Sequence, residues 1–304
     1  MSQKIIFFGN ERLGIGLGTN APVMRALIDE GYEIAALVVA QNEPNKSRNH
    51  RPMEVVELAS QHRIPVLSPE KLINIKEELQ SKQAKAGVLV AYGKLVPKAM
   101  IDMFPRGIVN IHPSLLPLHR GPTPIESVIL NGEKETGVSL MQLIDKMDAG
   151  PVYAQQKIKL SGREYKDEVV SKLMQVGTDL LIENLPNILN GSLEAIRQNN
   201  ALATYDNKIE KNDGVIDFNK EAIQIDRQIK AFMGWPRSRT LIGTTEVIVT
   251  KAHVAEIDGT PGTLYFEGQQ FGIHCQKGTI MIDMLIPAGK KEMTGSDFLL
   301  GYTP

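Results

Sequence analysis

Three side chains of this sequence form the set that a proton-transfer reaction at a carbonyl group needs. Asn110 and His112 lie two residues apart, and Asp148 follows 36 positions after the histidine. An amide can donate a hydrogen bond to an oxyanion, an imidazole can take up a proton near neutral pH, and a carboxylate can orient the imidazole. This chemistry needs neither a metal nor a covalent nucleophile. The candidate catalytic residues are therefore Asn110, His112 and Asp148.

The position of the imidazole in the expected sheet favours a functional role. A continuous apolar run predicts a buried strand over Gly107–His112, and ligands of open α/β sheets bind beyond the carboxyl ends of such strands. Asn110 lies two residues before His112, so both side chains point to the same face. The alternative is that Asn-x-His marks only a polar strand end and that Asp148 is only a turn residue.

Apolar runs and amphipathic stretches alternate through the first half of the chain. Continuous runs are typical of strands buried on both faces, whereas an apolar period of about 3.6 residues predicts helices. The predicted strands are Ile5–Phe8, Ile34–Val39, Ile64–Leu67, Ala86–Ala91, Gly107–His112, Gly137–Leu143 and Val152–Leu160, the last of them near an edge. The predicted helices are Ala21–Glu30, Met53–Gln61, Leu72–Gln83 and Tyr165–Leu189. This alternation predicts βαβ units in a Rossmann-like parallel sheet.

The pattern changes after the last of these helices. Asn190-Gly191 suits a left-handed helix C-cap, and a polar, irregular stretch follows it. One more helix over Ile223–Phe232 and several short apolar runs with turn signals then predict a small OB-like β-barrel. These runs are Thr245–Ala252, Gly262–Phe266, Phe271–Cys275 and Thr279–Leu285. We expect an α/β chain with a catalytic domain at 1–190, a linker at 191–205 and a smaller C-terminal β-barrel domain at 206–304.

Composition excludes several classes of protein. An apolar fraction of 42% supports a folded core, and 34 Lys and Arg against 35 Asp and Glu leave a net charge of −1. The chain therefore has no global basic excess that would indicate a nucleic-acid partner. No run approaches 18 apolar residues, so we expect no membrane span. The single cysteine, Cys275, and a start without a signal-like segment predict a cytoplasmic protein, which we expect to be a monomer.

Several motifs together resemble those of the folate-dependent formyltransferases, and the likeness covers nearly the whole chain. In the first half they are residues 114–124 directly after the candidate histidine, Glu135–Gln142 leading to Asp148-Ala149-Gly150, and Val90-Ala91-Tyr92-Gly93 with Pro97. Motifs of the second half are similar to those of the family members that act on a tRNA. These are Tyr205–Ile209 with Ile216-Asp217-Phe218, Gly234-Trp235-Pro236, and residues 287–291 with Asp297-Phe298-Leu299.

The resemblance implies transfer of a formyl group from 10-formyltetrahydrofolate, a cosubstrate, to an amine without a metal. It implies that Asn110 donates a hydrogen bond to the oxyanion, that His112 is the general acid and base, and that Asp148 orients the imidazole. It also implies that the folate lies against Val90, Ala91, Tyr92, Gly93, Ser114, Leu115, Leu116 and Pro117. The pterin ring is expected to meet backbone groups of the first four, and Leu115 could equally belong to the core.

The resemblance also implies initiator methionyl-tRNA as the acceptor of the formyl group. The loop that would enter the acceptor stem corresponds to residues 41–52, which carry three Lys or Arg residues and one acid. Residues 205–304 hold 11 Lys or Arg against 13 Asp or Glu. Contacts with phosphates must therefore come from a local patch. The candidate tRNA-binding residues are Lys46, Arg48, Arg51, Lys290 and Lys291.

Two features invite other interpretations. Gly14–Thr19 has Gly-x-Gly-x-Gly spacing and not the G-x-G-x-x-G of dinucleotide sites, so we interpret it as a flexible loop near the substrate entrance. The remaining histidines lack the spacing of metal ligands, and we interpret them as surface or packing residues. They are His50, His62, His119, His253 and His274.

Three rival functions stay open from the sequence. A nucleotide-linked amino sugar could accept the formyl group, water could accept it in a hydrolysis, or the chain could be a folate- or RNA-binding module without activity. The intact set of Asn110, His112 and Asp148 argues against the binding module. The motifs after residue 205 favour the tRNA over the amino sugar.

Overall fold

The computed structural model describes residues 3–14, 16–40 and 53–302. The chain forms two compact units. Unit 1 consists of Met1–Pro124, Glu135–Lys159 and Val170–Asn207, and unit 2 consists of Ile125–Lys134, Leu160–Val169 and Lys208–Pro304. The domain limits expected from the sequence stay predictions. Within the described ranges, no helix is long and apolar enough to cross a lipid bilayer.

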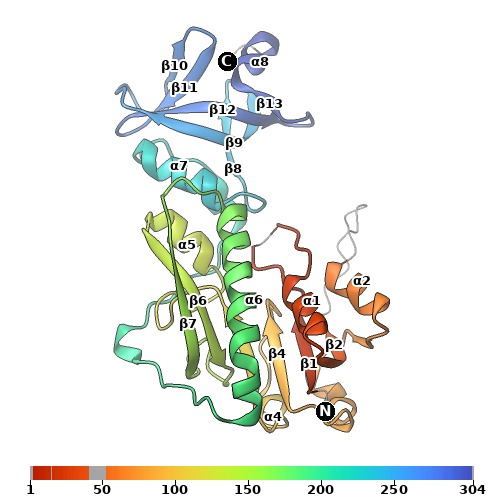
Figure 1. The fold of residues 1–304 in the computed structure, drawn as a ribbon. Helices are drawn as coiled ribbons and strands as arrows, with labels where there is room; N and C mark the ends of the chain where they lie inside the picture. The colour runs from red at the N-terminus through yellow and green to blue at the C-terminus, as the bar shows by residue number, and fades with distance from the viewer. Residues whose placement is uncertain (1–2, 15, 41–52, 303–304) are drawn as a thin grey trace. The chain divides into compact units, whose positions relative to one another are not determined.

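Unit 1 is built on a seven-stranded sheet in the order β3-β2-β1-β4-β5-β6-β7 (Figure 1). Its strands are β1 (Lys4–Gly9), β2 (Glu33–Val38), β3 (Val66–Leu67), β4 (Ala86–Val90), β5 (Ile108–His112), β6 (Glu135–Gln142) and β7 (Val152–Lys159). All pairs from β3 to β5 are parallel. Every residue of β4 and β5 is buried, as expected for parallel strands covered on both faces. The predicted Rossmann-like α/β class is confirmed.

The direction of the strands reverses after β5. β6 pairs antiparallel with β5, and β7 pairs antiparallel with β6. The connection between β6 and β7 is short, which suits an antiparallel pair, whereas a parallel pair needs a longer crossover. β7 ends the sheet, as its alternating pattern predicted, and residues 155–157 of this strand are exposed. The seven-stranded sheet is therefore mostly but not wholly parallel.

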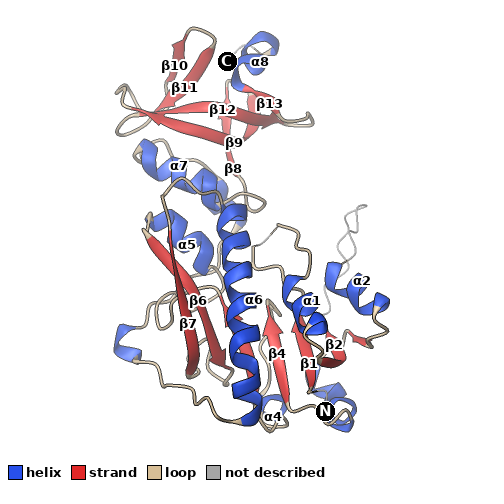
Figure 2. Cartoon of the chain, in the orientation of Figure 1, coloured by secondary structure: helices blue, strands red, loops and turns tan. Residues whose placement is uncertain are grey.

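Helices accompany the sheet of unit 1, as its alternating sequence pattern predicted (Figure 2). They are α1 (Pro22–Asp29), α2 (Glu54–Gln61), α3 (Lys76–Ser81), α4 (Lys98–Ile101) and most of α6 (Lys166–Asn190), with 3₁₀ turns η1 (Leu72–Ile75) and η2 (Asn200–Leu202). The single helix predicted over Leu72–Gln83 is wrong in part, because the backbone of Ile75 leaves the helical region between η1 and α3. α6 packs closely on the sheet, since a Cβ added at Gly177 would lie 2.9 Å from the side chain of Ile111.

Unit 2 contains a six-stranded antiparallel sheet with the path β10-β11-β12-β9-β8 and with β13 paired to β12. Its strands are β8 (Ser238–Ile242), β9 (Thr245–Ala255), β10 (Leu264–Glu267), β11 (Gln270–His274), β12 (Thr279–Pro287) and β13 (Met293–Thr294). Its helical elements are α5 (Pro124–Asn131), η3 (Lys211–Gly214), α7 (Ala222–Ala231) and α8 (Gly295–Gly301). The sequence predicted β9 to β12 and α7. It missed β8, β13, α5 and α8, which are short.

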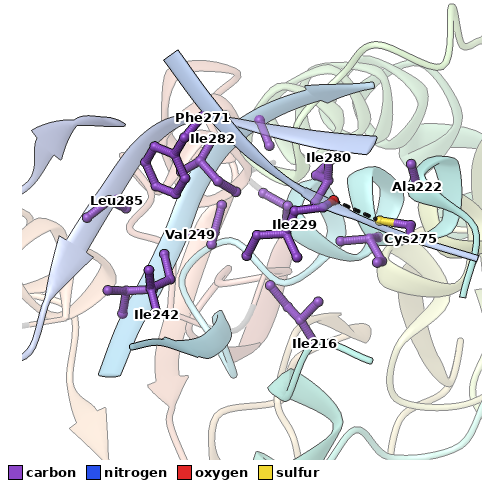
Figure 3. Close-up of a cluster of buried hydrophobic side chains, with 14 of the residues drawn as sticks. Ile216, Ala222, Ile229, Ile242, Val249, Phe271, Cys275, Ile280, Ile282 and Leu285 are labelled. Atoms are coloured by element: carbon purple, nitrogen blue, oxygen red, sulfur yellow. Dashed lines mark hydrogen bonds between the residues drawn. The ribbon is translucent and has the colours of Figure 1, made fainter. Parts of the chain in front are cut away.

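One face of α7 forms the core of unit 2 with the sheet. Ile229 of α7 is buried in the same cluster as Val249, Phe271 and Ile280 (Figure 3). The ring of Phe271 stacks on that of Phe298 in α8, with ring centroids 5.9 Å apart. Burial also raises the pKa of the free Cys275 thiol, which therefore packs as a small apolar side chain.

The glycine-containing turn after β1 delivers a carboxylate to the first turn of α1. Glu11 is buried, and its two carboxylate oxygens each accept a backbone hydrogen bond of 2.8 Å, from Val23 and from Met24. The N-cap position, Ala21, has no side-chain oxygen to serve these groups. A dinucleotide pyrophosphate would bind at such a helix N-terminus. An acidic side chain in that place argues against the nucleotide interpretation of Gly14–Thr19.

We predict that Glu11 makes the stability of the protein fall as pH rises. Burial raises the pKa of Glu11 from 4.5 to about 7, against the opposing effect of the two backbone hydrogen bonds. A carboxyl whose pKa is higher in the folded state favours folding less once pH passes its unfolded value, so the loss develops between pH 4.5 and about 7. Glu11→Gln should remove this loss, which is at most about 3 kcal/mol. Urea unfolding of both proteins between pH 4.5 and 8 measures it.

Glu30→Gln is the matched control, because Glu30 is exposed at the other end of α1. Its free energy of unfolding should follow the pH dependence of the unmodified protein. If the free energy of unfolding of Glu11→Gln shows the same pH dependence as that of the unmodified protein, then Glu11 does not titrate as its burial requires.

Candidate active site

Strand β5 carries two of the three candidate catalytic side chains. Asn110 and His112 lie on the same face of this strand, because they are two residues apart. They are 7% and 5% exposed. β5 is fixed on both sides, because it pairs with β4 and places Asn110 opposite Met141 and His112 opposite Ser139 of β6. Among the described residues, the side-chain amide of Asn110 has no hydrogen-bond partner. That amide is therefore available to a ligand oxygen.

The two ring nitrogens of His112 face different groups. Nε2 lies 3.0 Å from the backbone oxygen of His119, and Nδ1 lies 3.7 Å from Oδ1 of Asp148. A carbonyl oxygen can only accept a hydrogen bond, so Nε2 carries a hydrogen. In the neutral ring the lone pair is then on Nδ1, on the side of Asp148. A proton taken up at Nδ1 would form an imidazolium beside this carboxylate.

The ring of His119 is itself held by a carboxylate. Its Nδ1 lies 3.0 Å from Oδ2 of Asp206, and its backbone N–H donates to the hydroxyl of Thr204 at 2.8 Å. The side chain of His119 is buried. The sequence-based interpretation of His119 as a surface or packing residue did not foresee its polar partner. Sequence patterns do not reveal this pair, because the two residues lie 87 positions apart. The pair and the Thr204 contact fix the carbonyl that orients His112.

The third candidate, Asp148, lies in the loop between β6 and β7. Its Oδ2 accepts a 2.8 Å hydrogen bond from the backbone of Gly121. Its backbone has a φ of 47°, which is unusual for a residue other than glycine. The loop is also tight at Gly150, where an added Cβ would lie 1.8 Å from the backbone oxygen of Gln142. The structure therefore brings Asp148 to His112 by a constrained loop.

A serine of β6 holds the loop that follows His112. Oγ of Ser139 donates to the backbone oxygen of Ser114 at 2.6 Å and accepts from the backbone nitrogen of Leu116 at 3.0 Å. Gln155 of β7 donates to the same hydroxyl and to the backbone oxygen of Leu116, both at 2.8 Å. The Leu116–Pro117 peptide bond in this loop is cis. Sequence reasoning missed Ser139 and Gln155, whose partners lie far away in the chain.

The residues expected to meet the folate lie in two segments that end strands of the sheet. Val90 ends β4, and the carbonyls of Val90 and Ala91 accept hydrogen bonds from the turn after β1. The Tyr92 side chain is buried edge-on against Phe8, so only its backbone can face a ligand. Gly93 is exposed. The segment can therefore offer backbone groups, which is the kind of contact expected for the pterin.

The second folate segment has mixed exposure. Ser114 is fully buried, and its hydroxyl donates to the backbone oxygen of Leu118 at 2.7 Å. Leu116 is buried as well, whereas Leu115 and Pro117 are only partly covered. Leu115 and Pro117 are thus the side chains of this loop that can contact a cosubstrate, and Ser114 supports the loop from inside.

The candidate tRNA-binding residues are described only in part. Lys46, Arg48 and Arg51 lie outside the described residues. Lys290 and Lys291 are exposed in the turn between β12 and β13 of unit 2. Their ammonium groups are accessible to a polyanion.

A metal site and a large cavity are two other places where chemistry could occur. Within the described ranges, no group of three or more His, Cys, Asp or Glu side chains could hold a metal ion. A cavity of about 570 Å³ lies in unit 2, and its lining includes Phe232, Arg237 and Lys251. It contains none of the candidate catalytic residues.

Comparisons with known proteins match both halves of the chain. The family model described as formyl transferase matches residues 13–185, and the one described as formyl transferase, C-terminal domain, matches residues 208–303. The methionyl-tRNA formyltransferase of Pelobacter propionicus is 34% identical over 99% of this chain and 93% of its own length. That of Chloroflexus aurantiacus is 35% identical over 98% of this chain and 97% of its own length.

A solved structure shares the fold at lower sequence identity. The N-formyltransferase from Helicobacter canadensis, in complex with folinic acid and dTDP-3-aminofucose, superposes with a TM-score of 0.69. The match covers 93% of this chain and 99% of that chain at 20% identity. At this identity the likeness concerns the fold alone.

We predict that Ser139→Ala destabilises unit 1. The substitution leaves the backbone oxygen of Ser114 and the backbone N–H of Leu116 without their partner in a buried place. Leaving such groups unsatisfied costs about 1–3 kcal/mol each, so a loss of roughly 2–6 kcal/mol is expected for the two. Urea unfolding measures it. Ser60→Ala, on the exposed side of α2, is the control, and an equal effect of the two variants would contradict the assignment.

Proposed function

The chain belongs to the formyl transferase family, and on this premise we propose that it formylates the amino group of initiator methionyl-tRNA with 10-formyltetrahydrofolate. The product is N-formylmethionyl-tRNA for translation initiation. The observation that carries the proposal is the placement of His112 between the His119 carbonyl and the Asp148 carboxylate, on a strand that also carries Asn110. Curated relatives that act on methionyl-tRNA match both halves of the chain.

The reaction requires an amine to attack the formyl carbon on N10 of the folate. The new C–N bond forms while the carbonyl electrons move to oxygen, and an oxyanion develops. We assign the stabilisation of this oxyanion to the Asn110 amide, which has no other partner among the described residues. The C–N10 bond then breaks, the electron pair returns to N10, and the formyl group stays on the amine. One oxyanion donor typically contributes roughly 10²–10³ in rate.

The proton released by the attacking amine needs an acceptor, and we assign this role to Nδ1 of His112. The hydrogen bond from Nε2 to the His119 carbonyl leaves Nδ1 as the basic nitrogen of the neutral ring. Asp148 lies beside Nδ1 and stabilises the imidazolium once the proton has moved. The same proton can then be delivered to N10 as the folate leaves. His112 thus acts first as base and then as acid.

The cosubstrate assignment rests on the two strand-end segments of unit 1. We propose that backbone groups of Val90, Ala91, Tyr92 and Gly93 bind the pterin and that the loop of Ser114, Leu115, Leu116 and Pro117 lies against the folate. The partly covered side chains of Leu115 and Pro117 support this contact. The carbonyls of Val90 and Ala91 already accept hydrogen bonds from the turn after β1, which makes the first segment a rigid edge.

The acceptor assignment rests on the second half of the chain. The matches to methionyl-tRNA formyltransferases cover 99% and 98% of this chain, so they include its C-terminal half. A nucleotide-linked amino sugar is the alternative, because a sugar N-formyltransferase shares the fold. We further propose that the protein acts in the cytoplasm, in keeping with its single, free and buried thiol.

The decisive assay supplies 10-formyltetrahydrofolate with either charged initiator tRNA or a dTDP-linked amino sugar. We expect release of tetrahydrofolate and formylation of the methionyl amine with the tRNA, and no turnover with the sugar. His112→Ala should lower turnover with the tRNA by at least about 10², the usual contribution of a general acid and base. Formylated product, separated after deacylation, is the measured quantity.

His62→Ala is the matched control, because His62 is exposed at the end of α2. Transfer to the sugar but not to the tRNA would reject the proposed acceptor. Near-normal turnover of His112→Ala, with the tRNA still formylated, would remove His112 from the mechanism and leave the acceptor assignment intact.

We expect Lys290 and Lys291 to contact tRNA phosphates. The affinity for initiator tRNA should then fall with rising salt, and each lost lysine contact should reduce the slope of log Kd against log salt by about 1. Lys290→Ala and Lys291→Ala are compared with Lys277→Ala, an exposed lysine in another turn of unit 2. If all three variants keep the slope of the unmodified protein, the two lysines do not contact phosphates.

A further inference from the structure

Gln198 clamps the loop that carries Asp148. Its side-chain nitrogen Nε2 donates two hydrogen bonds, to the backbone oxygen of Asp148 at 2.8 Å and to that of Gly150 at 2.7 Å. The glutamine belongs to the polar stretch after α6, in which most residues are exposed. It bridges residues 48 and 50 positions away in sequence. The amide therefore ties a surface segment to the loop of the candidate carboxylate.

The clamped loop needs such support because its backbone is strained. The φ of 47° at Asp148 lies in the left-handed region, and a residue other than glycine keeps such a backbone only where the surrounding structure fixes it. The two carbonyls held by Gln198 belong to Asp148 itself and to Gly150, two residues further along the loop. The Gly121 N–H holds the carboxylate itself. Backbone and side chain of Asp148 are thus fixed by different partners.

Arg120 determines which way the Gln198 amide points. Its guanidinium donates to Oε1 of Gln198 from Nε at 3.1 Å and from Nη2 at 2.7 Å. Because Oε1 accepts these two bonds, the NH₂ group of the amide must face the carbonyls of the loop. Arg120 is 1% exposed, and its charge strengthens the bonds that it donates.

Arg120 is anchored by further contacts in the same unit. Nη2 also donates to Asn200 at 2.8 Å, and Nη1 donates to the hydroxyl of Tyr205 at 2.9 Å. The backbone of Arg120 pairs with Thr204 and Asp206. The next residue is Gly121, the donor to the Asp148 carboxylate. Arg120 and Gly121 thus both support Asp148. Gly121 donates directly to its carboxylate, and Arg120 holds Gln198, which donates to its backbone oxygen.

We propose that Gln198 is a positioning residue that holds the Asp148 carboxylate beside the imidazole of His112, with Arg120 as its anchor. The proposal rests on the function assigned above. At the observed 3.7 Å, a small movement of the carboxylate changes its interaction with an imidazolium, because charge–charge energy falls with distance. Misplacement of a catalytic group by about 1 Å can cost roughly 10² in rate. Loss of the clamp should therefore lower kcat more than it raises KM.

Gln198→Glu separates positioning from simple structural support. A glutamate keeps the volume and still accepts from Arg120, but it cannot donate to the carbonyls of Asp148 and Gly150. We expect kcat for formylation of methionyl-tRNA to fall about 10- to 10²-fold. The KM for 10-formyltetrahydrofolate and equilibrium binding of tetrahydrofolate should change little. Arg197→Ala, the exposed neighbour, is the matched control and should retain full activity.

A double-mutant cycle tests whether Gln198 acts through Asp148. If it does, Gln198→Glu should lower kcat in the unmodified protein and should have no further effect in an Asp148→Ala background. Gln198→Met, which keeps the length and removes both amide groups, repeats the cycle should the acidic variant fold poorly. A fall of equal size in both backgrounds would overturn the proposal, as would full activity of both Gln198 variants.

The failure of the proposed function would look different. Asp148→Ala with normal turnover would remove Asp148 from the chemistry and overturn both assignments together. Normal tetrahydrofolate binding with a low kcat in Asp148→Ala, combined with full activity of the Gln198 variants, would overturn only the clamp.

Discussion

The hydrogen bond between Nε2 of His112 and the His119 carbonyl is the constraint on which the proposed chemistry depends. It commits one ring nitrogen to the protein and leaves the other beside Asp148, where the proposed mechanism exchanges a proton. The position of this carbonyl is fixed, because the His119 side chain contacts Asp206 and the His119 backbone N–H donates to Thr204. The imidazole of the candidate base His112 is thus oriented by a backbone group whose own position is fixed by the buried contact between His119 and Asp206.

The sheet explains how such different segments meet. β5 is buried and paired on both sides, so Asn110 and His112 have no freedom to shift along the strand. The reversal of strand direction after β5 brings β6 and β7 alongside. Ser139 and Gln155 of these strands then fix the loop after His112, and the turn between them presents Asp148. A fully parallel sheet would need crossovers in their place.

Much of this arrangement could be predicted from residues whose environment is local. The buried strand ending at His112, the edge position of β7 and the helix at α7 follow from apolar periodicity, which depends on near neighbours in sequence. The motif context of Asp148 pointed to the histidine, and the structure places the two side chains 3.7 Å apart. Their catalytic roles stay predictions.

The supporting residues could not be predicted in this way. Gln198, Arg120 and Asp206 act through hydrogen bonds to residues tens of positions away, and such contacts leave no period in the sequence. The region predicted as one helix over Leu72–Gln83 is a 3₁₀ turn followed by a short α-helix, and each buries one leucine, Leu72 or Leu79, so the apolar spacing alone does not distinguish it from a single helix. Short elements such as β8 and α8 carry too few residues for a pattern to appear.

The polar stretch that follows α6 is part of the structure around the candidate site. Residues 191–207 fall within the compact unit that contains His112, and they supply Gln198, Asn200 and Tyr205 to its hydrogen bonds. A fragment that stopped at the end of α6 would keep the whole sheet and all three candidate catalytic side chains. It would nevertheless lack the amide that fastens the aspartate loop. An exchange of the C-terminal half between relatives would therefore have to be joined after residue 207 to keep these hydrogen bonds of unit 1.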